Sequence, residues 1–423
     1  MDRAKFALMW VVLVDIMGQG LAFPIFNTLT TDPSAGFAPK NITASAAGLD
    51  FSLLIAVFFL TWFLGVVFVS RLSDSLGRRR GLLICLAGSF TGYLLTILAI
   101  FLDSFWLLLA SRAITGFTAG TQPIAQAGMV DLATDEVDKG RNMGLIMLGT
   151  SIGLIAGPVI GGVFSDASLI GGVASLWLPF VIGAAFNIAA LAFVFFWFRD
   201  NRSYDAPLRI NPVDVFRLLW EVRLYPAVLR ISVVFFFFEL SFLGAYVFLA
   251  NYFSAAYGMT TAGTSVAMLV LGVALAFASA VLVGPVLARF ARWAILATTQ
   301  AVIAISVALI VTAPSAVLAY AALVPLAVAF GIGYPTFLTI YSASASQDRQ
   351  GWVMGVEIAL FTLAGGLVSI LSGELLALGT RAPFYLGVAG GVLSLALMAL
   401  LWRTPAMRAI IAPRRDGSGG HTP

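Results

Sequence analysis

The sequence contains very few of the residues that usually build catalytic or metal sites. Of 423 residues, one is cysteine, one is histidine, and only 10% are charged. The single cysteine, Cys85, stands in an apolar run, which excludes an intrachain disulfide and indicates a packed thiol. The single histidine, His421, lies in a Gly/Ser-rich tail. We therefore expect no metal and no cofactor, and no histidine-based catalysis.

Apolar residues dominate instead, at 60% of the chain, which is too many for a soluble protein of this length. Runs long enough to cross a bilayer of ~30 Å recur from end to end, and without water the backbone in such runs must be helical. The prediction is an all-α integral membrane protein. Its twelve transmembrane helices are expected near residues 5–28, 48–70, 81–102, 105–131, 141–164, 174–198, 227–254, 262–288, 293–313, 315–343, 352–378 and 383–402.

The basic residues predict the orientation of these helices. With the N-terminus in the cytoplasm, 21 of the 24 Lys and Arg fall inside, leaving out only Lys40, Arg112 and Arg381. This asymmetry follows the positive-inside rule and places both termini in the cytoplasm. The net charge of +4 thus reflects topology, and we expect no nucleic-acid partner. The first run is too long for a cleaved signal peptide and is expected to stay as a helix.

An internal repeat divides the chain into two similar parts. The loop over 70–80 recurs in weaker form over 284–293, and Gly140-Arg-Asn-Met-Gly recurs as Gly351-Trp-Val-Met-Gly. Both echoes are separated by about half the chain, which indicates two like halves. Many transporters place their substrate site between two such halves.

The domain prediction follows from this repeat. We expect two pseudo-symmetric six-helix bundles, at residues 1–198 and 227–402. A cytoplasmic linker at 199–226 joins them, and a disordered cytoplasmic tail follows at 403–423. Within the linker, Asn211-Pro212 is typical of an N-cap and a first-turn proline. Val213, Phe216, Leu219 and Trp220 then share one face of a short amphipathic helix, expected at the inner membrane surface.

The loop over 70–80 resembles the segment between helices 2 and 3 of the major facilitator superfamily. Five residues match the family pattern: Leu72, Asp74, Gly77, Arg78 and Arg79. The resemblance implies that Asp74, Gly77 and Arg78 form a conformational latch with Asp131, the acid that ends helix 4. The alternative is a set of solvated loop charges, because any inner loop is basic.

Three further segments are similar to the tetracycline-efflux-like, drug:proton antiporter branch of that superfamily. Helix 1 carries Asp15 followed by Met17-Gly18-Gln19-Gly20, and helix 4 carries Arg112 before Gly116 and Gly120. Helix 5 resembles the antiporter motif, with Gly149, Gly153, Gly157, Pro158, Gly161 and Gly162. Glycines every four residues let another helix approach closely, and a proline invites a bend. We expect this string to form a bendable contact between the halves.

Away from the ends of the predicted spans, four charged residues stand out: Asp15, Arg112, Glu239 and Glu357. Each would cost roughly 2.5–3.5 kcal/mol bare at the bilayer centre, so they must be paired, neutralised or line a cavity. The prediction is that Asp15 carries the proton, that Arg112 modulates it, and that Glu239 is a second coupling residue. Static pairing of Asp15 with Arg112 and a structural Glu239 remain alternatives. Glu357 is expected to be structural.

A substrate cavity is expected where polar groups and aromatic rings gather near these charges. A cavity with few polar groups and many rings suits bulky amphipathic compounds. Interhelical hydrogen bonding is the default role for glutamines inside such helices. The predicted substrate-binding residues are Gln19, Gln122, Gln126, Phe238, Glu239, Phe242 and Tyr246.

The resemblance implies a proton-coupled efflux antiporter that exports a small amphipathic compound, tetracycline-like or another drug, by alternating access. Helix 8 here is almost wholly Ala, Val, Leu and Gly, unlike that of tetracycline exporters, which leaves tetracycline itself in doubt. The alternative is a uniporter or importer without proton antiport. An enzyme is not expected, since the sequence has no nucleophile elbow and no cluster of metal ligands. We expect a monomer in the bacterial inner membrane, with a small molecule and protons as its partners.

Overall fold

The computed structural model describes four stretches of the chain, residues 2–39, 43–200, 213–346 and 349–411, and all regular structure in them is helical. Eleven helices within these stretches are long and apolar enough to cross a bilayer. The remaining expected span, 105–131, is present as two shorter helices in series. The all-helical membrane fold is therefore confirmed, with helix 4 interrupted.

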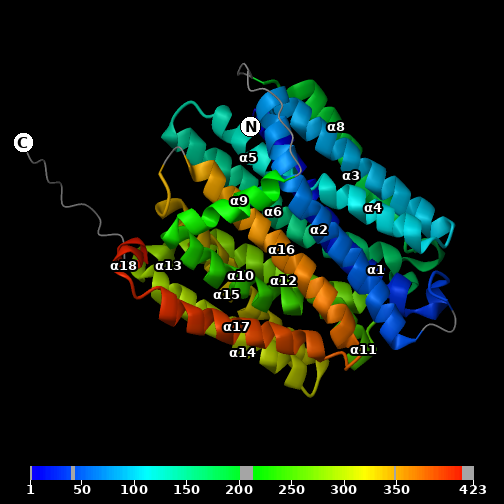
Figure 1. Ribbon diagram of the computed structural model, residues 1–423. Coiled ribbons are helices and arrows are strands. Elements are labelled where there is room, and N and C mark those ends of the chain that lie inside the picture. The colour runs from blue at the N-terminus through cyan, green and yellow to red at the C-terminus, as the bar shows by residue number, and fades with distance from the viewer. Residues whose placement is uncertain (1, 40–42, 201–212, 347–348, 412–423) are drawn as a thin grey trace, which may run out of the picture.

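The spans of the first half follow in order along the chain (Figure 1). They are α1 (Arg3–Thr31), α2 (Ala44–Leu76), α3 (Arg78–Phe101), α4 (Phe105–Phe117) with α5 (Thr121–Asp131), α6 (Glu136–Ser165) and α8 (Leu178–Trp197). A short helix, α7 (Ala167–Ile170), links α6 to α8. Within this half, α1 packs against both α6 and α8, and α3 packs against α4 and α8.

The spans of the second half repeat this plan. They are α10 (Pro226–Tyr246) with α11 (Leu249–Tyr257), α12 (Thr261–Phe277) continued by α13 (Val283–Arg289), α14 (Arg292–Thr312), α15 (Ala316–Ala343), α16 (Gln350–Leu376) and α17 (Ala382–Leu401). Residues 278–282 between α12 and α13 form a π-helical turn. Within this half, α10 packs against α17 and α16, and α14 packs against α15 and α17.

Side-chain caps fix the ends of several helices. Asp2 accepts a hydrogen bond from the backbone of α1, Ser104 from that of α4, and Asp135 from that of α6. Such caps satisfy backbone N–H groups that have no partner inside the helix. The spans therefore begin where the polar loop residues stand.

The two halves meet along two helix pairs, α2 with α16 and α6 with α12. In Figure 1, α2 (blue) runs beside α16 (orange) across the middle of the molecule. Glycines on α16 make this approach close: a Cβ added at Gly365 would lie 2.6 Å from the ring of Phe59, and one at Gly373 would lie 3.0 Å from Ser52. Small residues of α16 thus allow the close approach at this helix pair, and Gly272 of α12, where an added Cβ would lie 2.7 Å from the Leu154 oxygen, does so at the other.

The interruption of helix 4 has a local cause. The amide of Ala119 bonds to the carbonyl of Gly116 at 3.0 Å, and the amide of Gly120 bonds to the carbonyl of Thr118 at 2.9 Å. These short-range bonds replace the continuing helical ladder, so α4 ends at Phe117 and α5 starts afresh at Thr121. The amides of the first turn of α5 consequently point into the protein near mid-membrane.

The linker helix is shorter than the sequence predicted. Helix α9 spans Asp214–Glu221 and follows Val213, which makes no side-chain cap, while Asn211 and Pro212 lie outside the described residues. Asp214 is buried and pairs with Arg71 of α2. Of the predicted apolar face, Val213, Phe216 and Trp220 are exposed, while Leu219 packs against the bundle and the Phe216 ring also meets Phe63 of α2 at 5.9 Å.

The C-terminal segment differs from the expected disordered tail. Residues Pro405–Ile411 form helix α18, in which Met407 and Ile411 are buried. Arg292 of α14 donates a hydrogen bond to the carbonyl of Ile410 at 2.6 Å. The prediction for 403–423 is therefore corrected over this helix, because its apolar residues find a surface to cover; residues 412–423 lie outside the described part.

Candidate functional site

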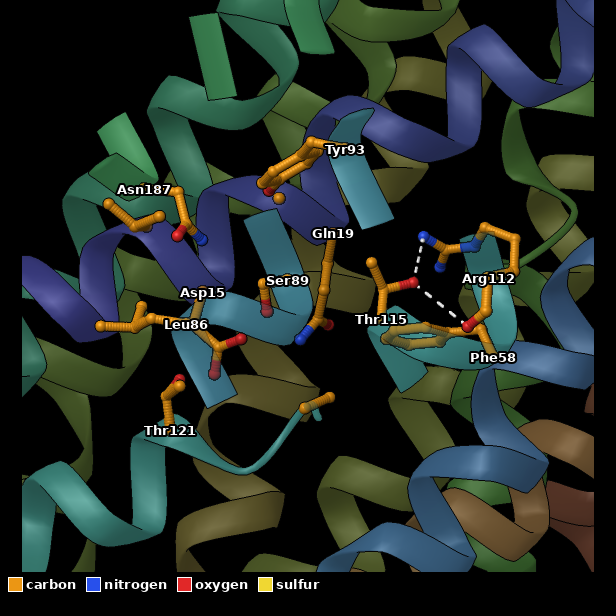
Figure 2. A pocket seen from close by; sticks show the side chains of 13 residues that line it. Asp15, Gln19, Phe58, Leu86, Ser89, Tyr93, Arg112, Thr115, Thr121 and Asn187 are labelled. Carbon is orange, nitrogen blue, oxygen red and sulfur yellow. Dashed lines mark hydrogen bonds between the residues drawn. The ribbon is translucent and has the colours of Figure 1, made fainter. Parts of the chain in front are cut away.

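A narrow cavity lies inside the first half, among α1, α2, α3, α4, α5 and α8. It has room for a few water molecules, and polar side chains line much of it. Figure 2 shows these side chains converging from several helices. The lining residues are Val14, Asp15, Gly18, Gln19, Phe58, Leu86, Ser89, Tyr93, Arg112, Thr115, Ala119, Thr121 and Asn187.

Asp15 reaches this cavity from the middle of α1. Its carboxylate faces the N-terminus of α5, where the Thr121 hydroxyl and the backbone amide of Gln122 act on it (Figure 2). The start of a helix carries a partial positive charge and favours a nearby anion. The break in helix 4 thus supplies Asp15 with a polar partner that an unbroken helix would keep within its own hydrogen bonds.

Arg112 enters the same cavity from α4 and is only 7% exposed. Its guanidinium lies over the ring of Phe58, 4.3 Å from the centroid, and over Phe26 at 5.0 Å. It donates a hydrogen bond to Thr115 at 3.3 Å, while its buried Nε has no partner. Cation–π contacts partly replace the water that this charge has lost.

Asp15 and Arg112 share the cavity without forming an ion pair with each other in the described part of the chain. Figure 2 shows them on opposite sides, with Gln19 and Ser89 between them. Static pairing, one alternative from the sequence, is therefore wrong for this conformation. The arrangement leaves each charge able to respond to what enters the space between them.

The phenol of Tyr93, on α3, interacts with both charges. Electrostatic interactions link its phenol to Asp15 and to Arg112. Its hydroxyl lies directly over Gly18 of α1, where an added Cβ would come within 2.3 Å of the oxygen. Gly183 of α8 borders the ring from another side. Glycine at position 18 is therefore required for Tyr93 to reach the cavity.

The predicted glutamines divide between the cavity and the helix beside it. Gln19 lines the cavity, as its position one turn after Asp15 on α1 requires. Gln122 and Gln126 lie half-buried on α5 and are not among the lining residues. Gln122 contributes its backbone amide to Asp15, which side-chain reasoning did not anticipate.

The predicted residues of helix 7 belong to a separate aromatic region in the second half. Phe238 and Glu239 are fully buried, and Phe242 stacks on Phe330 with ring centroids 3.6 Å apart and on Tyr246 at 5.4 Å. Tyr246 meets Phe23 of α1 edge-on at 5.4 Å. These rings therefore extend from the second half to the first.

The same aromatic region continues toward Arg112. Phe330 stacks on Tyr334 at 5.6 Å, and Tyr334 approaches Phe361 of α16 at 6.5 Å. Phe361 meets Trp62 of α2 at 5.8 Å, and Trp62 meets Phe58 at 5.6 Å. We call this series, from Phe23 through Tyr246, Phe242, Phe330, Tyr334, Phe361 and Trp62 to Phe58, the aromatic belt.

The expected latch residues lie at the inner ends of the helices. Arg78 at the start of α3 forms an ion pair with Asp131 at the end of α5, with Nε and Oδ2 3.6 Å apart. Arg78 also donates to the Ser73 hydroxyl at 2.7 Å. Gly77 has φ +98°, a conformation that favours glycine, and lets α2 turn into α3. The side chain of Asp74 lies outside the described residues.

The glycine string of α6 meets α1 of its own half, which corrects the prediction that it contacts the other half. Cβ atoms added at Gly149, Gly153 and Gly157 would each lie 2.6 Å from a backbone oxygen of α1. Pro158 of α6 adjoins Gly20 of α1. Sequence spacing shows that an approach is close and cannot show which helix approaches.

The last two glycines of the motif differ in what they touch. An added Cβ at Gly161 would meet Leu21 of α1 at 3.1 Å, whereas one at Gly162 would meet Ser265 of α12 at 2.7 Å. Among the five glycines of the string, Gly162 is the one whose nearest neighbours belong to the second half. The string thus sets the distance between α6 and α1 and adjoins α12 at its outer end.

Polar contacts also join the two halves at their outer ends. Asn251 of α11 donates to Asn27 of α1 at 3.1 Å, and the hydroxyls of Thr28 and Thr261 lie 2.7 Å apart. Asp166, beyond α6, accepts hydrogen bonds from Ser168 and also from Thr260 and Ala262 at the start of α12, and these hold its pKa below the usual value. We call these the outer contacts, after the side on which the predicted orientation places them.

Several site residues escaped the sequence prediction. Tyr93, Ser89, Thr115 and Thr121 are single polar residues in apolar helices, and nothing in their spacing separates them from ordinary interhelical hydrogen-bonding groups. The same holds for Asn187 of α8. No group of three or more His, Cys, Asp or Glu able to hold a metal occurs in the described part of the chain.

Comparison with known proteins decides the family. A family model described as Major Facilitator Superfamily matches residues 8–369. The chain belongs to this superfamily. Its helices are thus those of a multi-pass membrane transporter and not of an enzyme. The predicted fold and family are confirmed.

Relatives within the superfamily are similar along most of their length. The class C tetracycline resistance protein of Escherichia coli is 28% identical over 372 residues, covering 86% of this chain and 87% of that protein. The quinolone resistance protein NorA of Staphylococcus aureus (strain MRSA252) is 23% identical over 398 residues, covering 92% and 94%. Their names place this chain near drug resistance proteins.

Solved structures agree in fold. The human organic anion transporter MFSD10 has a TM-score of 0.71 at 20% identity, covering 94% of this chain and 99% of that chain. A D-xylose-proton symporter has a TM-score of 0.73 at 16% identity, covering 96% and 98%. At these identities the likeness establishes the fold alone.

Proposed function

We propose that this superfamily member is a proton-coupled efflux antiporter that exports a small amphipathic compound by alternating access. One observation carries the proposal: Asp15, Arg112 and Tyr93 line a single water-sized cavity without an ion pair between the two charges. Tetracycline and quinolone resistance proteins among the relatives support a drug as the exported compound.

Proton exchange at Asp15 follows from its surroundings. A carboxyl group that meets a cation in one state and an apolar enclosure in another changes its affinity for a proton. Arg112 lines the same cavity as Asp15, and Thr121 and the amide of Gln122 in the first turn of α5 contact its carboxyl group. Movement of either relative to Asp15 would release or load a proton, with Arg112 as modulator and Glu239 as a second coupling residue.

The aromatic belt supports a binding surface for the exported compound. Its rings come from both halves and end beside Arg112, so a flat apolar compound would touch both halves at once. Phe242 and Tyr246 belong to the belt, with Phe238 and Glu239 directly behind it. Gln19, Gln122 and Gln126 of the first half are the polar groups assigned to substrate orientation in this proposal.

Alternation between the halves is the remaining element. The outer contacts close the outer side in this structure, so the substrate path is expected to open inward first. At the inner end, the latch of Asp74, Gly77, Arg78 and Asp131 is proposed to fasten the inner ends of α2, α3 and α5 as the halves rock. The cycle would then open the outer contacts to release the compound.

The remaining features complete the proposal. We expect the protein to act as a monomer in the bacterial inner membrane with both termini in the cytoplasm, where its basic loops lie. Residues 1–198 and 227–402 are proposed as the two moving bundles, with 199–226 as their tether. Small-molecule substrate, protons and lipid are its partners.

The test uses everted membrane vesicles energised to hold an inward-acid proton gradient. Adding a transported compound should release protons from vesicles with the wild-type protein and release none with Asp15→Asn. Asp103→Asn, in the exposed outer loop, is the matched control and should behave like the wild type. Full proton release by Asp15→Asn would overturn the assignment of the carrier. Transport that continues after the gradient is collapsed would favour a uniporter instead.

A further inference from the structure

The second half encloses two carboxyl groups, one on α10 and one on α16. Glu239 of α10 is 0% exposed and Glu357 of α16 is 2% exposed. Both oxygens of Glu239 and one oxygen of Glu357 are buried without a hydrogen-bond partner. Buried carboxylate oxygens are normally paired, so three unpartnered ones in one region point to an occupant.

Ring contacts bring the two residues to one place. Tyr334 of α15 lies 6.3 Å from Phe235, which is one helical turn before Glu239 on α10. Tyr334 also lies 6.5 Å from Phe361, which is one turn after Glu357 on α16. Residues four apart share a helix face, so both carboxyl groups face the junction at Tyr334.

The electrostatic contacts agree with this geometry. The charge of Glu357 acts on Glu239, and the Tyr334 phenol donates a hydrogen bond to Glu357. The second phenol within reach of both carboxyl groups, Tyr341, donates its own hydrogen bond to Ser232 at 3.0 Å. The titratable groups that face the pair from α15 are therefore both phenols, which bring no positive charge.

In the described part of the chain, the buried polar side chains that α14 and α17 contribute beside α10 are uncharged. They are Thr299, Gln300 and Ser306 of α14 and Ser394 of α17, which bonds to the backbone of α10. Arg71 of α2 and Asp214 of α9 form an ion pair with each other. Those charges stand at the inner end of the bundle, beside the loop and linker.

We propose that Glu239 and Glu357 form a carboxyl pair that binds a proton in the second half, with Tyr334 as the residue that positions it. Two like charges so enclosed cannot both stay ionised without a cation, and a proton held between them satisfies the unpartnered oxygens. The pair changes Glu357 from a structural residue into a partner of Glu239. It rests on the proposed function only in making this proton part of transport, in addition to the one at Asp15.

Tyr334 connects the pair with the aromatic belt. Its phenol bonds to Glu357, while its ring stacks on Phe330 and meets Phe361 edge-on. A compound that displaces this ring would also shift the hydrogen bond to the pair. Binding in the belt and proton binding are thus linked through one side chain.

Infrared difference spectroscopy of the purified protein tests the pair without any transported compound. The wild type should show the stretching band of a protonated carboxyl at neutral pH, and Glu239→Gln with Glu357→Gln together should remove it. Glu357→Gln alone should change the proton affinity of Glu239 by about tenfold or more, because the groups titrate together. Tyr334→Phe should shift the band and keep it. Glu374→Gln, exposed on the same helix, should change nothing.

Two results would overturn the proposal: a spectrum in which both groups are ionised at neutral pH, or a Glu239 titration unchanged by Glu357→Gln. If Glu357→Gln fails to fold, Glu239→Gln tests the coupling from the other side, because it should change the titration of Glu357, and an unchanged Glu357 titration would overturn the proposal. Since no solute is added, the band reports the pair even if the protein proves to transport without proton exchange. If the band is present and the protein transports without proton exchange, the proposed function is wrong and the carboxyl pair stands.

Discussion

In the first half, Asp15 lies in a cavity with Arg112, whereas in the second half Glu239 and Glu357 are enclosed among aromatic rings. The acid of the first half faces a helix start and a guanidinium across water-sized space. The acids of the second half face each other and two phenols. A buried carboxyl can be tolerated through opposite charge or through a retained proton, and we propose that this chain uses one solution in each half.

The largest effect should come from removing the positive charge of the first half. Arg112→Gln leaves Asp15 without its modulating cation and should lower exchange about 100-fold, since leaving a buried charge unbalanced costs about 3 kcal/mol or more. Arg112→Lys keeps the charge and loses the planar contact with Phe58, and should lower exchange about tenfold. Initial rates in vesicles measure both, with Arg381→Gln as the control. Exchange by Arg112→Gln at the wild-type rate would contradict the claim that the first half balances Asp15 with a cation.

The glycine seams of the two halves should differ next. Gly153→Ala places a Cβ 2.6 Å from the Leu13 oxygen, so α6 and α1 must separate, and the loss should be about 1–3 kcal/mol. Gly387→Ala in the second half meets the Ser241 oxygen at 3.0 Å and should cost less. Gly144→Ala meets nothing within 4 Å and should be neutral. Thermal midpoints of the purified variants should follow this order, and an equal midpoint for Gly153→Ala and Gly144→Ala would refute the close seam.

A smaller effect is expected where the halves touch. Asn27→Ala or Asn251→Ala removes the 3.1 Å hydrogen bond of the outer contacts, and such bonds in membranes average about 0.6 kcal/mol, which corresponds to about threefold in population. Distance measurements across the outer ends should show more open protein in each single variant and no further change in the double variant. Additive changes would mean that the two amides act separately. Thr31→Ala, which removes only a bond within α1, is the control.

The smallest effect concerns Asp166 and pH. Its hydrogen bonds with Ser168, Thr260 and Ala262 hold its pKa below the usual value, so the ionised form is the one that stabilises the folded state. That contribution is present above the usual titration range of an aspartate and is lost as the pH falls through it. The thermal midpoint of the wild type should fall by about one or two degrees more than that of Asp166→Asn over this acid range. Parallel pH profiles would contradict the contact.

Most of the fold was predictable because hydrocarbon leaves the backbone few choices. The apolar runs set the spans, and the matches around Asp74 and Arg78 indicated the family. The interruption of helix 4 was not predictable, since it depends on the short-range backbone bonds at Ala119 and Gly120, which no spacing of residue types indicates. The partner of the glycine string was also beyond the sequence, because spacing alone does not name the facing helix.

The site was predictable only in its charges. Asp15 and Arg112 stand out because charge is rare in a span, and both line the cavity. Tyr93 and Tyr334 did not stand out, because a tyrosine in an apolar helix has many ordinary roles. Glu357 was predicted as structural because its distance from Glu239 depends on how α10 meets α16, which no linear pattern records.

Proteoliposomes with the purified protein test the central claim most directly. A proton gradient imposed across the lipid should drive accumulation of an exported compound against its own gradient, and a protonophore or Asp15→Asn should abolish that accumulation. Accumulation that is indifferent to the size and direction of the proton gradient would contradict proton exchange at Asp15 and leave a facilitator without coupling.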